Sequence, residues 1–193
     1  MEKKRMQLYH KMTIAGLDRS LPICPLNEKL SIAGFVIFGD PELTVACAEQ
    51  LLEKVKDIEF DYLFAPEAKA IPLIHEMARQ SGRKEYLLAR KNPKLYMTGV
   101  FKHTVRSITT AKEQTLYLDT ADVEKMKGKK ILLIDDVIST GASLEALESL
   151  VEKAGGSVAG KCAILAEGDA QNRSDIIYLE KLPLFNSKGE IIA

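Results

Sequence analysis

The sequence has little of what marks the specialised protein classes. It contains 12 glycines and 7 prolines in 193 residues, too few for a collagenous or low-complexity chain. No stretch approaches the ~18 continuous apolar residues of a membrane span. The charged start, residues 1–6, is not followed by the apolar region of a signal peptide. We therefore expect a folded cytoplasmic protein with no membrane partner.

Cysteine and net charge are also scarce. Cys24, Cys47 and Cys162 are odd in number, widely spaced and set among apolar residues, which favours buried thiols in a reducing compartment over a disulfide or zinc framework. Lys and Arg together number 27, as do Asp and Glu. Without an overall basic field, the chain is not expected to bind nucleic acid, and any anion site must be local.

The apolar pattern alternates between short runs and stretches of helical period, which is typical of an α/β protein, and the length fits one domain over 1–193. Short runs predict an extended segment at 32–38 and strands at 62–65, 86–89, 131–134 and 157–166. Helical spacing predicts helices at about 41–55, 71–80 and 144–154. The weak periodicity of residues 90–115 predicts a loose hairpin or long loop, after which regular structure resumes at 116–118.

The stretch 131–143 is the most informative. Four apolar residues suit a central parallel strand, so the adjacent Asp135 and Asp136 would lie at its carboxyl end, where open α/β sheets bind ligands. Small and hydroxyl residues, among them Thr140 and Ser143, then open a helix whose N-terminus can bind a phosphate. Because carboxylates repel phosphate, the acids should accept hydrogen bonds from sugar hydroxyls, and a ribose phosphate fits both halves.

Two other interpretations compete for this stretch. Asp136 and Ser139 could simply cap a helix. Alternatively, 131–136 could be the Walker B strand of a nucleotide hydrolase, because Gly155 to Cys162 comes close to a phosphate loop. That second reading fails, since this segment runs from helix into strand and Cys162 lacks the hydroxyl that binds magnesium.

Residues 131–143 resemble the phosphoribosyl pyrophosphate (PRPP) signature of type I phosphoribosyltransferases, and the resemblance extends from about Phe35 to Glu167. Residues 67–70 are similar to the pyrophosphate loop of the adenine branch, usually Glu-Ala-Arg-Gly, and residues 90–94 to its basic loop. The excursion 95–115 is closer to the xanthine branch, with Met97-Thr98 and 107–112 in matching order.

The resemblance implies a central, mostly parallel sheet flanked by helices, a small hood from about 1–40 and 167–193, and a flexible lid loop over about 95–115. It implies a purine-salvage enzyme that transfers the ribose 5-phosphate of PRPP to a purine base and releases pyrophosphate through an oxocarbenium-like state. Mg²⁺ would be held by PRPP, beside the acids rather than directly on them. It also implies a homodimer that shares the basic loop.

The same resemblance implies a role for each matching residue. The catalytic acids would be Asp135 and Asp136, and the 5′-phosphate loop Ser139, Thr140, Gly141, Ala142 and Ser143. Pyrophosphate would contact Glu67, Ala68, Lys69, Ala70, Arg90, Lys91 and Lys94, and the purine would contact Ile37, Phe38, Gly39 and Glu167. Taken alone, Arg90, Lys91 and Lys94 are more often a solvated basic turn than a site. Phe38 could equally belong to the core, and the lid could be an ordinary exposed hairpin.

Departures from the family pattern leave alternatives open. Lys69 and Ala70 replace Arg and Gly, and an Arg common at the position of Gly39 is missing. Gly168 stands where the xanthine branch has a Lys that answers a 2-oxo group. We therefore favour adenine over xanthine or hypoxanthine. A PRPP-sensing regulator that has lost the transfer step is the alternative from another class.

Overall fold

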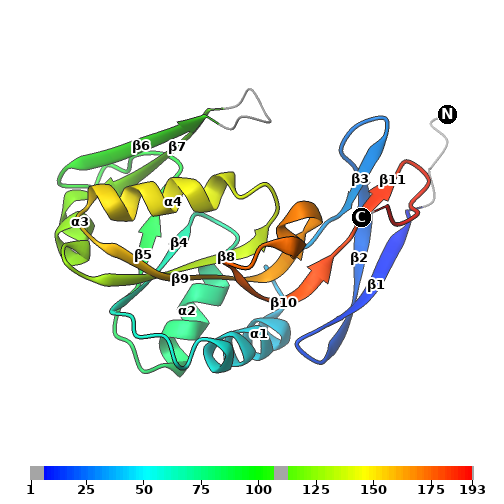
Figure 1. The fold of residues 1–193 in the computed structure, drawn as a ribbon, viewed down its shortest axis with the longest axis horizontal. Helices are drawn as coiled ribbons and strands as arrows, with labels where there is room; N and C mark the ends of the chain where they lie inside the picture. The colour runs from blue at the N-terminus through cyan, green and yellow to red at the C-terminus, as the bar shows by residue number, and fades with distance from the viewer. Residues whose placement is uncertain (1–6, 107–112, 193) are drawn as a thin grey trace.

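The computed structural model describes residues 7–106 and 113–192, and strands and helices alternate through most of the chain (Figure 1). The strands are β1 (Tyr9–Ile14), β2 (Leu17–Pro25), β3 (Leu30–Ala33), β4 (Tyr62–Pro66), β5 (Leu87–Ala89), β6 (Val100–Arg106), β7 (Glu113–Asp119), β8 (Lys130–Ile138), β9 (Ser157–Glu167), β10 (Ile177–Leu182) and β11 (Leu184–Asn186). The helices are α1 (Pro41–Lys54), α2 (Ile71–Gln80), α3 (Thr120–Met126), α4 (Ala142–Lys153) and the 3₁₀ helix η1 (Gly168–Asn172). Within the described ranges, no helix is both long and apolar enough to cross a membrane.

The main sheet has five strands in the order β10-β9-β8-β4-β5. Every neighbouring pair is parallel. Residues 131–134 of β8 are fully buried, as expected for a central strand covered on both faces. The predicted α/β class, with a parallel sheet between helices, is confirmed.

Side-chain alternation along β8 separates two hydrophobic cores. Leu132 and Ile134 pack with buried residues of α1 and α2, whereas Ile131 and Leu133 pack with those of α4. Figure 1 shows the consequence, with α1 and α2 below the sheet and α4 above it.

The helix predictions match the structure because their local signals are strong. The Asp40 side chain accepts a hydrogen bond from the backbone of Leu43, and Pro41 begins α1. Leu43, Cys47 and Leu51 are buried along one face of this helix. Helix α4 ends just before Gly155, whose φ of +77° suits a residue that follows a helix C-terminus.

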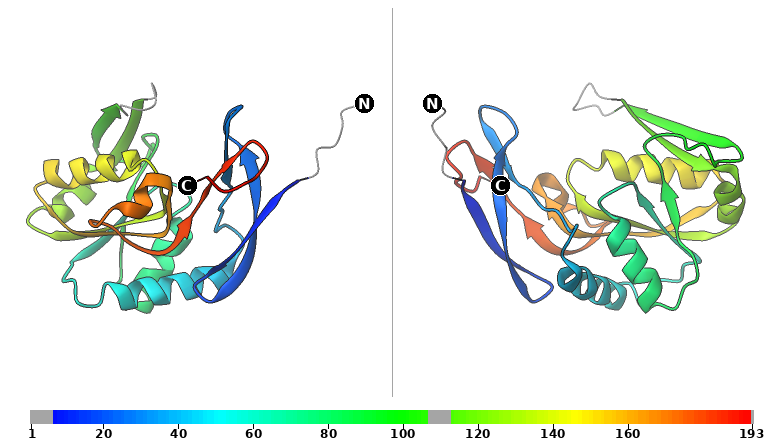
Figure 2. Two further views of the ribbon diagram at one scale, coloured as in Figure 1. Left: turned by 45° about the vertical axis from the view of Figure 1, so that its right-hand side comes forward. Right: turned by 180° about the vertical axis from the view of Figure 1, so that it is seen from behind.

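A second sheet, which we call the hood sheet, has the order β1-β2-β3-β11 and is antiparallel. It lies beside the main sheet in both views of Figure 2. Its Ile14, Leu21 and Phe185 belong to the same core cluster as Leu63 and Cys162 of the main sheet. The two sheets therefore share one continuous core.

Several predicted boundaries were wrong. The strand predicted at 131–134 runs over 130–138 and includes both acids, because its ladder to β9 continues as far as Ile138. In the extended segment predicted at 32–38, only 32 and 33 are strand. Of the hood expected from 167–193, β10 instead joins the main sheet by pairing with β9, whereas β11 pairs with β3 and Ile191 bridges Phe185.

The predicted loose hairpin is an ordered pair of strands, β6 and β7, which include the separately predicted 116–118. Leu116 and Leu118 are fully buried in the cluster that contains α4, so the arms of the hairpin are anchored on the body. The sequence did not predict α3, which begins after the capping carboxylate of Asp119. The tip, with 107–112 of the xanthine-like pattern, lies outside the described residues.

Candidate active site at the carboxyl ends of the parallel strands

The two acids lie at the carboxyl end of β8, as predicted, and both are buried. Asp135 is 7% exposed and Asp136 is 4% exposed. The backbone N–H of Asp136 donates to Oδ1 of Asp135 over 2.9 Å. Burial, reinforced by the neighbouring Asp136, raises the pKa of Asp135 well above its ordinary value. The pair therefore holds a proton more tightly than two exposed carboxylates would.

Lys69 supplies the counter-charge from the turn between the neighbouring strand β4 and α2. Its Nζ lies 2.8 Å from Oδ2 of Asp136, and the lysine side chain is 49% exposed. At this distance the ammonium and the buried carboxylate form an ion pair. A buried carboxylate is costly unless a cation or hydrogen-bond donors compensate it, and Lys69 supplies such a cation.

Glu167 ends β9 and completes this group. Burial raises the pKa of Glu167, and the charge of Lys69 acts in the opposite direction. Lys69 follows β4 by three residues, the acid pair lies near the end of β8, and Glu167 is the last residue of β9, so these groups lie near the carboxyl ends of three adjacent parallel strands. This is the edge where ligands bind in open α/β sheets.

Glu67 contacts three residues of the predicted basic loop, 90–94. Its Oε1 lies 3.5 Å from Nη1 of Arg90 and 3.4 Å from Nζ of Lys94, and its Oε2 accepts from the backbone of Lys91 at 3.0 Å. Burial acts to raise the pKa of Glu67, but the Lys91 hydrogen bond and the two cations outweigh it and lower the pKa. The side chain of Lys91 is exposed. The Glu67–Ala68 peptide bond is cis.

The backbone conformations of Ala70 and Gly168 explain two departures from the family pattern. Ala70 precedes α2 with φ −74° and ψ −8°, an ordinary helical conformation that needs no glycine. Gly168 has φ +58°, and a side-chain carbon there would approach Leu184 to 3.0 Å. A lysine is therefore strained at Gly168, whereas alanine at position 70 is not.

The predicted phosphate loop, 139–143, joins β8 to α4. Gly141 caps the helix with φ +83° and without a side-chain hydrogen bond, so the interpretation of Asp136 or Ser139 as a helix cap is wrong. Ser139 and Thr140 are exposed. The first backbone N–H groups of a helix have no acceptor within it and attract anions.

The predicted base segment 37–39 lies between the hood sheet and α1. Ile37 is 1% exposed, whereas Phe38 is 48% exposed, so Phe38 is not a core residue. Arg19 of β2 binds Asp40 through Nε at 2.6 Å and Nη2 at 3.0 Å. Sequence reasoning missed Arg19, because nothing in the alternation of a hairpin strand reveals its partner.

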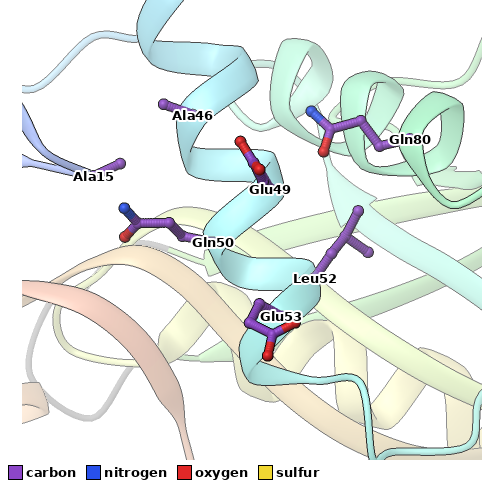
Figure 3. A pocket seen from close by; sticks show the side chains of 7 residues that line it. All are labelled: Ala15, Ala46, Glu49, Gln50, Leu52, Glu53 and Gln80. Atoms are coloured by element: carbon purple, nitrogen blue, oxygen red, sulfur yellow. The ribbon is translucent and has the colours of Figure 1, made fainter.

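The described contacts do not bring every predicted residue together. Asp136, Lys69 and Glu167 form one group, and Glu67 with 90–94 forms another. Among the described residues, Phe38 takes part in neither group of hydrogen bonds and ion pairs. A hollow lined by Ala15, Glu49, Glu53 and Gln80, among others, lies over α1 and contains no predicted site residue (Figure 3).

Comparison with known proteins agrees with this geometry. The model of the phosphoribosyl transferase domain matches residues 41–185. The adenine phosphoribosyltransferase of Pseudothermotoga lettingae is 37% identical over 155 residues, which cover 80% of this chain and 87% of the relative. That of Kosmotoga olearia is 35% identical over 154 residues, covering 77% and 84%.

Solved structures give the same fold. The adenine phosphoribosyltransferase of Rhodothermus marinus has a TM-score of 0.64 at 22% identity, covering 90% of this chain and 94% of that one. That of Thermoanaerobacter pseudethanolicus has a TM-score of 0.63 at 23% identity, covering 75% and 84%. Since the domain match spans most of the chain and a relative aligns over nearly its whole length, this protein belongs to the type I phosphoribosyltransferase family.

Proposed function

We propose that the protein transfers the ribose 5-phosphate of PRPP to adenine, forming AMP and releasing pyrophosphate in purine salvage. The observation that carries the proposal is the buried acid pair of β8, Asp135 and Asp136, with Nζ of Lys69 lying 2.8 Å from Oδ2 of Asp136. A glycine-capped helix N-terminus that suits phosphate follows this pair along the chain. A ribose phosphate supplies a hydroxyl donor to the first and an anion to the second.

The reaction needs the ribose held still while charge leaves with pyrophosphate. The acids on β8 would hold the ribose hydroxyls, and loop 139–143 the 5′-phosphate. Lys69, Arg90, Lys91 and Lys94 would neutralise the departing pyrophosphate, and Glu67 would orient Arg90 and Lys94. The segment 37–39 and Glu167 would bind the base. The predicted lid over about 95–115 would exclude water, which otherwise hydrolyses the activated sugar.

Magnesium fits this arrangement as an ion carried by the substrate. Asp135 and Asp136 offer the hard oxygen atoms that Mg²⁺ prefers, to which a metal-bound water would donate. Within the described residues no group of three or more metal-ligating side chains gathers, so the other ligands would come from PRPP and water. The ion would supply charge neutralisation at pyrophosphate.

Gly168 supports adenine over xanthine, because its conformation disfavours the lysine that would answer a 2-oxo group. A PRPP-sensing regulator was the second candidate, motivated by Lys69 and Ala70. The unstrained backbone of Ala70 and the contact of Lys69 with Asp136 weaken that motivation. The free thiols of Cys24, Cys47 and Cys162 suit a reducing compartment, and we propose the cytoplasm. We also propose one domain and a homodimer.

The test is to incubate the protein with PRPP, Mg²⁺ and adenine, hypoxanthine or xanthine and to follow nucleotide formation. We expect AMP from adenine and little product from the other bases. Asp136→Asn should lower kcat/KM by an amount equivalent to ~2–4 kcal/mol of transition-state stabilisation, the scale of one preorganised polar contact. The variant should stay folded. PRPP binding without turnover of any base would instead indicate the regulator.

A further inference from the structure

Arg173, which sequence reasoning also missed, lies against the phosphate loop. A side-chain carbon at Gly141 would meet Nη1 of Arg173 at 2.5 Å, so the glycine leaves the space that this nitrogen occupies. Figure 1 shows η1, which directly precedes Arg173, beside the N-terminal end of α4. Because loop 139–143 has no Lys or Arg of its own, Arg173 adds the guanidinium that the loop lacks.

A network of ion pairs orients this guanidinium. Nε and Nη2 of Arg173 donate to the two carboxylate oxygens of Asp175 over 2.9 and 2.7 Å. Nζ of Lys161 lies 2.9 Å from Asp175 and 2.9 Å from Glu148 of α4. Asp175, itself held by Lys161, thereby fixes the orientation of the Arg173 guanidinium. Asp175 faces Nε and Nη2, which leaves Nη1 as the nitrogen directed at Gly141.

The acidic first turn of α4 gives a reason for such a cation. Glu145 lies within the first turn, where its carboxylate repels a bound phosphate dianion. Arg173 interacts electrostatically with Glu145 and Glu148 and so offsets that repulsion. A guanidinium also offers planar N–H donors that match phosphate oxygens.

We propose that Arg173 is a binding residue for the 5′-phosphate, with Nη1 adding a charge-assisted hydrogen bond to those of the backbone N–H groups of 139–143. Asp175 is then a positioning residue that acts through Arg173. This inference rests on the proposed function, because it takes loop 139–143 as the phosphate site.

The test uses ribose 5-phosphate as the probe, because its binding requires no transfer step. Calorimetry should show that Arg173→Met weakens ribose 5-phosphate about tenfold or more, the range of a lost hydrogen bond to a charged group, and leaves pyrophosphate binding unchanged. Arg79→Met is the matched control, because Arg79 also forms an ion pair with a carboxylate, Glu76, but lies on α2 away from the phosphate loop. In turnover assays Arg173→Met should raise KM for PRPP and not KM for adenine.

Three results separate this inference from the proposed function. If the wild type binds ribose 5-phosphate and Arg173→Met binds it equally well, the inference is wrong, whether or not AMP forms. If the wild type binds ribose 5-phosphate but forms no nucleotide, the proposed reaction fails, while a weaker Arg173→Met still supports the inference. A wild type that does not bind the probe contradicts the phosphate site and this inference together.

A second variant covers the case in which Arg173→Met does not fold. Arg173→Lys keeps the positive charge but loses the planar donors, and it should bind ribose 5-phosphate more weakly than the wild type. Equal affinity of the lysine variant would contradict the hydrogen bond from Nη1. Asp175→Asn should weaken ribose 5-phosphate less than Arg173→Met does, and the reverse order would overturn the positioning role.

Discussion

At the scale of single residues, burial decides the protonation of Asp135. Its raised pKa means that the folded protein binds this proton more tightly than the unfolded chain does. The resulting stabilisation is complete below the ordinary pKa of an aspartate and is lost as pH rises through the raised folded-state pKa. We expect Asp135→Asn to abolish that loss and to be at least as stable as the wild type at about pH 8, although inactive.

The measurement is the free energy of unfolding in urea as a function of pH, together with turnover. Asp175→Asn is a control of opposite sign, because Arg173 and Lys161 lower the pKa of Asp175. Its contribution is present above the ordinary carboxyl pKa and lost as pH falls through the lowered value. Parallel pH curves for Asp135→Asn and the wild type would show that Asp135 does not carry the shifted proton.

At the scale of elements, Arg19 connects the hood sheet to α1 and the base segment. The same guanidinium binds Asp40 and, at 2.8 Å, Glu42, while Asp40 also caps α1. The arginine and Asp40 side chains are 24% and 28% exposed. Because solvent screens such a pair, we assign the interaction a stabilisation of about 1 kcal/mol. Arg19→Met should raise KM for adenine about fivefold and leave KM for PRPP unchanged.

Steady-state kinetics with each substrate varied in turn check this expectation. Arg79→Met again serves as the control, because its guanidinium pairs with Glu76 within α2. If both variants show the wild-type KM for adenine, the hood sheet does not position the base segment.

At the scale of the whole molecule, we predict that the exposed Lys91 serves a site shared between two copies of the chain. Arg90 and Lys94 face Glu67 of their own chain, whereas Lys91 contacts Glu67 only through its backbone. Removing a cation that contacts pyrophosphate should cost ~1.5–3 kcal/mol in PRPP use. If Lys91 serves the neighbouring subunit, mixing Asp136→Asn chains with Lys91→Ala chains should restore part of the activity.

The control is each variant mixed with itself under the same conditions, with heterodimer formation measured by native mass spectrometry. A heterodimer that forms but stays as inactive as its parents would show that Lys91 serves its own subunit or no site. This arrangement requires two copies of the chain, and it tests the dimer directly.

The local signals determined much of this protein. The apolar run 131–134, the cap at Asp40 and the spacing of Leu43, Cys47 and Leu51 specify a strand and a helix whatever surrounds them. The order of acids, hydroxyl residues and helix along 135–143 predicts the candidate acids and the candidate phosphate loop from neighbouring residues alone. Such patterns are readable because neighbours in sequence stay neighbours in space.

Only the tertiary structure decided which distant side chains meet. Arg19 reaches Asp40, Lys69 reaches Asp136 and Arg173 lies on Gly141. It also decided that β10 joins the main sheet while β11 crosses to the hood sheet. These contacts depend on strand order and on chain crossings between layers, which pack segments far apart in sequence. The pKa of Asp135 follows from the same packing, because burial and a neighbouring charge exist only once the fold has formed.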